Sequence, residues 1–296
     1  MYTRKSPLKF YWSSVLVALG YISGIFVAGM IDTVFGLQIS AEATHKSSLI
    51  LLLIGTVLLG AFIGPFASRL SLSRGQGFLL WGSLILFTFG SVTLEGAYFV
   101  PDLVSTPIPM LVMQQLFAAI GAALVIVSIF GTSRKTASWR SSLEQRPWYS
   151  WMWRFLLSAV SYLVFYFVVG GLNYQLVTKP YYETHAGGLT VPSVNIVLVV
   201  ESIRSILIVF SVFLFMLSTR GTRTQVMVST GWLLFAIGGI IPLILQIGTL
   251  PIFLLAASAV EIFFQNFLTG VVAAFLLGPE SLRGEELTRV VKPGIS

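Results

Sequence analysis

Charged residues inside apolar segments are the first candidates for chemistry in this sequence. Glu201 and Arg204 lie in the run IVLVVESIRSILIVF, and Glu261 lies in LLAASAVEIFFQNFLTG, where Gln265 and Asn266 follow it. A charged side chain near the centre of a membrane helix costs at least about 2.5–3.5 kcal/mol. Such a residue therefore faces the interior of a helix bundle, pairs with an opposite charge, or loses its own charge. It is a candidate for binding an ion or a solute.

Two interpretations of these charges stay open. Arg204 is one helical turn from Glu201 and can neutralise it, whereas Glu261 has no basic neighbour in its own segment. In the first interpretation they form a substrate or proton site together with Gln114, and Glu261 is protonated or paired with Arg204. In the second, Glu201, Arg204 and Glu261 form a buried structural cluster with Asn266 that fixes how the helices pack.

The only two histidines, His45 and His185, lie in similar polar stretches, EATHKSSL and ETHAGGL. Histidine and carboxylate side chains are ligands for divalent metals. Their spacing has no metal signature and they lie on separate loops, so we expect neither a metal site nor a cofactor. We expect instead an outer vestibule or helix-capping group, formed by Asp32, Glu42, His45, Asn173, Glu183 and His185.

The elements that position these residues are predicted to be membrane helices. Of the 296 residues, 56% are hydrophobic and only 10% are charged, compared with about 25% charged residues in soluble domains. The chain has no cysteine, which excludes disulfides and thiol chemistry. Its charges separate apolar runs rather than forming one patch, so we expect a lipid bilayer as partner and no nucleic acid. The apolar runs predict eight spans, at about 11–35, 48–68, 77–99, 108–131, 153–177, 192–218, 225–247 and 251–277.

The loops between these spans indicate an orientation. Fifteen of the 18 lysines and arginines lie before span one, in alternate loops on the same side, or in the C-terminal tail. Basic loops stay in the cytoplasm. The sequence therefore predicts a multi-pass cell-membrane protein with both termini cytoplasmic.

An internal similarity divides the chain in two. At an offset of 141, seven positions of the segment 12–32 match, and these include Trp12 with Trp153, Tyr21 with Tyr162 and Gly29 with Gly170. At an offset of 147, Gln114 falls opposite Glu261, so the first half lacks that carboxylate. We predict two parallel four-helix repeats, at 1–133 and 153–278, joined by a basic, tryptophan-rich linker at 134–152 and followed by a tail at 279–296.

Three classes of function are compatible with this arrangement. Parallel repeats and intramembrane carboxylates favour a transporter or binder of a small solute or ion, including a proton. The sequence contains no phosphate loop, G-x-S-x-G or H-E-x-x-H motif. A non-catalytic membrane subunit or regulator, bound to another membrane protein or to a second copy, is the alternative. An intramembrane enzyme that acts on lipid is the third.

Overall fold

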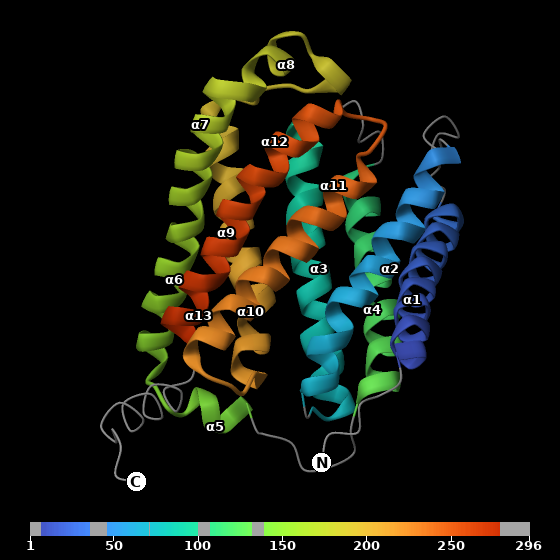
Figure 1. Ribbon diagram of the computed structural model, residues 1–296, viewed down its shortest axis with the longest axis vertical. Coiled ribbons are helices and arrows are strands. Elements are labelled where there is room, and N and C mark those ends of the chain that lie inside the picture. Colours follow the sequence, from blue (N-terminus) through green and yellow to red (C-terminus); the bar gives the residue numbers. More distant parts are fainter. Residues whose placement is uncertain (1–6, 36–45, 71, 100–106, 132–138, 279–296) are drawn as a thin grey trace.

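The computed structural model describes residues 7–35, 46–70, 72–99, 107–131 and 139–278, and within these ranges the chain is helical without a β-sheet (Figure 1). Eight helical segments are long and apolar enough to cross a membrane. The first four are single helices: α1 (Pro7–Val34), α2 (Lys46–Arg69), α3 (Arg74–Phe99) and α4 (Ile108–Phe130). We refer to these four helices as the first group.

The other four spans form the second group, and three of them are interrupted by π-helical turns. The fifth span consists of α6 (Trp148–Phe165), η3 (Tyr166–Gly170), α7 (Gly171–Asn173), η4 (Tyr174–Thr178) and α8 (Lys179–Glu183). The sixth span is α9 (Val194–Ser218). The seventh consists of α10 (Arg223–Phe235), η6 (Ala236–Ile240) and α11 (Ile241–Leu245). The eighth consists of α12 (Ile252–Ile262), η7 (Phe263–Phe267) and α13 (Leu268–Leu277).

The eight predicted spans are confirmed as helices of membrane length. Seven of them begin and end within three residues of the positions expected from the apolar runs. The fifth differs, because it runs from Trp148 to Glu183 rather than from 153 to 177. Pro147 precedes its first helical residue, and the tryptophan-rich segment after this proline is already helical. A short helix, α5 (Trp139–Leu143), lies in the linker before it.

The helices of each group pack among themselves, and contacts of α2 and α3 with the second group connect the two groups. In the first group α1 packs against α2 and α4, and α3 packs against α4. In the second group α6 packs against α9 and α13, and α10 packs against α13. Between the groups, α3 packs against α9, and α2 packs against α11. Of the candidate residues, Glu201 and Arg204 lie on α9, at this boundary.

Small residues allow the helices of the first group to approach closely. A Cβ atom at Gly24 would overlap the carbonyl oxygen of Phe117 on α4, and one at Gly20 would lie 2.7 Å from the Gly121 carbonyl oxygen. A Cβ atom at Gly60 would lie 2.7 Å from the Ser14 carbonyl oxygen. Glycine pairs of this kind let helix backbones touch within lipid. In this chain they serve packing between its own helices.

The two ends of the bundle differ in charge. One end, which we call the basic face, carries the ends of α2 and α9, the starts of α3, α6 and α10, and the linker helix α5 (Figure 1). The opposite end, which we call the α8 face, carries α8 and the loop that follows it. The described arginines of the basic face are Arg69, Arg74, Arg140, Arg146, Arg154, Arg220 and Arg223.

Candidate functional site

A buried ion-pair network connects the two groups of helices. The Nη1 atom of Arg204 on α9 donates to both carboxylate oxygens of Glu201, at 3.0 and 2.8 Å. The same nitrogen lies 2.7 Å from Oε1 of Glu95 on α3. Glu201 is fully buried, and only 5% of the Arg204 side chain is exposed. We call these three residues the Arg204 network.

Tyr162 completes the surroundings of this network. Its hydroxyl group donates to Oε2 of Glu201 at 3.1 Å. Its ring centroid lies 5.7 Å from the guanidinium carbon of Arg204, within the range of a cation–π contact. A buried ion pair needs such additional hydrogen bonds to offset the cost of removing both charges from water. Arg204 keeps one unsatisfied donor, because its buried Nε has no hydrogen-bond partner among the described residues.

Glu261 forms a second polar centre, held by amide groups. Its Oε2 accepts a hydrogen bond of 2.5 Å from Nδ2 of Asn173, and its Oε1 accepts one of 2.8 Å from Nε2 of Gln265. Gly170 provides the space, because a Cβ atom at this position would lie 2.8 Å from Oε1 of Glu261. Within the part of the chain that the structure describes, no cation pairs with this carboxylate.

Of the two alternatives given for Glu261, protonation or pairing with Arg204, the structure does not contain the pairing. Arg204 binds Glu95 instead, because Glu95 lies on α3, the helix of the first group that packs against α9. Glu261 lies on α12, which packs against α7 and the π turns η4, η6 and η7.

A cavity of about 140 Å³, which we call the outer cavity, lies beside both centres. Glu95 from the first group and Glu261 from the second group both line it. It extends to Tyr182 and Leu250, which lie at the α8 face. Glu261 is nine residues from the start of α12, about 13 Å along the helix axis at about 1.5 Å per residue. The carboxylates thus lie between the α8 face and the centre of the bundle.

Four π-helical turns contribute residues to the lining of the outer cavity. Tyr166 belongs to η3, Thr178 to η4, Gly238 to η6 and Gln265 to η7. Single π turns inside α-helices occur frequently at functional sites. Among the described residues, α1 to α4 contain no such turn. The irregular backbone is therefore concentrated in the group that carries Glu261.

The loop after α8 is fastened across the outer cavity. The backbone nitrogen of Thr190 donates to the carbonyl oxygen of Phe99 at 2.9 Å, which ties this loop to the end of α3. His185 has a left-handed backbone, with φ of 50°, and its Nδ1 lies 3.1 Å from the carbonyl oxygen of Leu189. Leu189 is buried and lines the cavity. His185 thus positions the loop rather than facing the carboxylates.

The remaining predicted residues are placed as follows. Asn173, expected in an outer vestibule, binds Glu261. Asp32 is buried on α1, where its Oδ2 has no hydrogen-bond partner among the described residues, and Gln114 is half-buried on α4 outside the outer cavity. Asn266 is buried beside Gly238.

His45 and Glu42 lie outside the described residues. In the described ranges no three His, Asp or Glu side chains gather closely enough to hold a metal ion.

Glu95 and Tyr162 are the residues that the sequence analysis did not place in the site. Glu95 lies near the end of the predicted span 77–99, where it was not counted among the charges inside apolar segments. The signal was the sequence GAYF after it, which adds one further helical turn before Pro101. Tyr162 was named only as the match of Tyr21 in the internal similarity. No feature of the sequence around it indicated a contact with Glu201.

Comparison of the chain with protein-family models, curated proteins and solved structures finds no match.

Proposed function

We propose that this protein binds a small cationic solute or ion inside the membrane and carries it across. The observation that carries the proposal is that Glu95 and Glu261, one from each group of helices, line the same cavity. Two carboxylates and no lysine or arginine line this cavity, so the site has an excess of acceptors. Ionisable residues inside a membrane mark ion and substrate pathways in many transporters. A cation or a proton would supply the missing positive charge.

We further propose that the chain is a parallel 4+4 repeat with the basic face in the cytoplasm. The pattern of packing supports the repeat, because the pairs α1–α4, α3–α4 and α1–α2 have counterparts in spans five–eight, seven–eight and five–six. The halves of a parallel repeat are related by a rotation about an axis along the membrane normal. In this chain such a rotation would exchange the contact between spans three and six with the contact between spans seven and two. Transporters with parallel repeats move one half relative to the other around a site at their interface. The outer cavity lies at such an interface.

A non-catalytic membrane subunit is the second candidate. The observation that favours it is the Arg204 network, in which each carboxylate already has a partner within the chain. A cluster satisfied in this way can serve only to hold α3 against α9. Glu261 distinguishes the two candidates, because among the described residues it has amide partners but no cation.

The test is the variant Glu261→Gln, compared with Glu183→Gln as a matched control. Glu183 is an exposed carboxylate at the α8 face and lies 3.7 Å from Lys179. The purified proteins are titrated with Na⁺, K⁺ and small primary amines while thermal unfolding is followed. A bound ligand at about 100 times its Kd adds roughly 2.7 kcal/mol to the stability.

We expect at least one cation to stabilise the wild type and Glu183→Gln but not Glu261→Gln. The Glu261→Gln variant should fold, because the glutamine carbonyl oxygen still accepts a hydrogen bond from Asn173. The cation that binds should then accumulate in proteoliposomes that contain the wild type. Equal stabilisation of all three proteins, or of none, would contradict the proposal and favour the subunit.

A further inference from the structure

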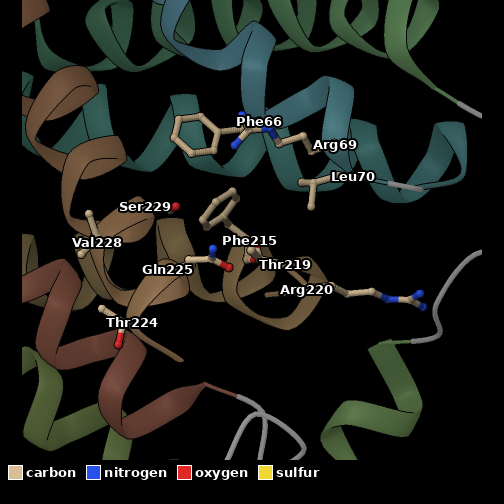
Figure 2. Close-up of a pocket in the computed structure, with 10 residues that line it drawn as sticks. All are labelled: Phe66, Arg69, Leu70, Phe215, Thr219, Arg220, Thr224, Gln225, Val228 and Ser229. Atoms are coloured by element: carbon tan, nitrogen blue, oxygen red, sulfur yellow. The ribbon is translucent and has the colours of Figure 1, made fainter. Parts of the chain in front are cut away.

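A second cavity, of about 480 Å³, lies at the basic face where α2, α9 and α10 meet (Figure 2). We call it the basic-face cavity. It shares no residue with the outer cavity, and no acidic side chain lines it. The residues that line it are Phe66, Arg69, Leu70, Phe215, Thr219, Arg220, Thr224, Gln225, Val228 and Ser229.

The side chains of this cavity are arranged in two levels. Arg69, Thr219 and Thr224 lie at the ends of the three helices, at the level of the basic face. Phe66, Phe215 and Val228 lie one helical turn further into the bundle. Figure 2 shows the Phe66 and Phe215 rings close together, and they make an edge-to-face contact with their centroids 5.6 Å apart. The polar level faces the end of the bundle and the apolar level faces its interior.

The two arginines of the cavity differ from most of the other arginines of the basic face. Arg146 and Arg154 donate to carbonyl oxygens at the end of α13, and so does Arg223. Arg140 pairs with Glu144. Arg69 and Arg220 make neither an ion pair nor a hydrogen bond within the described chain, so their donors are available to an anion.

The apolar side of the cavity is open between two helices. The α2 helix packs against η6 and α11, in the half of span seven nearer the α8 face, whereas its main contacts do not include α10. Val228 on α10 is 41% exposed at this opening. A hydrocarbon chain therefore has lateral access to the apolar level from the surrounding lipid.

We propose that the basic-face cavity binds an anionic phospholipid, with its phosphate group between Arg69 and Arg220 and its acyl chains along Phe66 and Val228. Guanidinium groups and hydroxyl groups are the donors that recognise phosphate oxygens. Basic pockets between membrane helices bind anionic headgroups in this way. The two levels of the cavity match the two parts of such a lipid, whereas a soluble anion would leave the apolar level without a partner.

The experiment measures retention of phosphatidylglycerol by the full-length protein in mixed micelles of phosphatidylglycerol and phosphatidylcholine. Native mass spectrometry counts the bound lipids, and titration gives the half-saturating concentration. The test variant is Arg69→Gln with Arg220→Gln. The control is Arg74→Gln, an exposed arginine on the same face that does not line the cavity. Each basic residue contributes about fivefold in affinity for anionic lipid, so the double variant should bind roughly 25-fold more weakly.

We expect the wild type and Arg74→Gln to retain phosphatidylglycerol in preference to phosphatidylcholine, and the double variant to lose that preference while its circular dichroism stays helical. Equal retention by the double variant and Arg74→Gln would overturn the proposal. Displacement of the lipid by millimolar inorganic phosphate would also overturn it and would assign the cavity to a soluble anion. Since the outer cavity is unchanged in these variants, their result is independent of cation binding at Glu261.

Discussion

At the scale of single residues, the buried network depends on one cation. Arg204 contacts Glu95 on one side and Glu201 on the other, so two carboxylates share one guanidinium group. Arginine suits this role because its planar group offers several donors in a fixed geometry. Loss of either glutamate leaves a neutral pair, whereas loss of Arg204 leaves two carboxylates without a cation. Loss of Arg204 should therefore destabilise the network more than loss of either glutamate.

We predict that Arg204→Met destabilises the protein by about 3–5 kcal/mol, the usual cost of breaking a buried ion pair by removing one partner. The matched change Arg140→Met removes an exposed pair with Glu144, which contributes less than about 1 kcal/mol. Thermal and denaturant unfolding in detergent compares the two variants. Equal stability of Arg204→Met and Arg140→Met would show that the network contributes nothing to folding.

At the scale of elements, the π turn η3 matters because it places Gly170 against Glu261. The neighbouring Gly171 has no atom within 4 Å of the position that a Cβ would take. Of these two adjacent glycines, only Gly170 contacts the candidate site, whereas Gly171 is exposed. Alanine at either position carries the same gain in helix propensity, about 1 kcal/mol.

We predict that Gly170→Ala displaces the Glu261 carboxylate, weakens cation binding at least tenfold and destabilises the protein relative to Gly171→Ala. The Gly171→Ala variant should bind as the wild type does and unfold at the same or a higher temperature. Binding titrations together with thermal unfolding measure both effects. The contact is irrelevant to the site if the two alanine variants bind equally well.

The helices were predictable from the sequence, whereas the partners inside the bundle were not. Continuous apolar runs mark the spans because each helix must cross the same thickness of hydrocarbon, and this reasoning located all eight. The pairing of Arg204 with Glu95 depends on which helix packs against α9, and hydropathy carries no information about that. The π turns were not predicted either, because an extra residue in a helical turn leaves the apolar pattern nearly unchanged. The Glu201–Arg204 contact was predictable because it is local.

At the scale of the whole molecule, the distribution of charge gives the orientation a direct test. The chain has no cysteine, so any introduced thiol is the only one present. We predict that Thr184→Cys, at an exposed position of the α8 face, reacts in intact cells with a reagent that cannot cross membranes. We predict that Glu144→Cys, exposed at the basic face, reacts only after permeabilisation. The reverse pattern would place the basic face outside.

The positions of the buried charges along the chain also determine the order in which these charges and their partners enter the membrane during synthesis. Glu95 is synthesised with the third span, 109 residues before Arg204, and it lies near the end of α3 with 30% of its side chain exposed. Arg204 and Glu201 emerge together in one helix, so the sixth span enters the bilayer already paired. Glu261 arrives in the eighth span, 88 residues after the Asn173 amide that receives it. The translocation machinery therefore meets each costly charge either near a helix end, beside its counter-ion, or after its hydrogen-bond donor has been inserted.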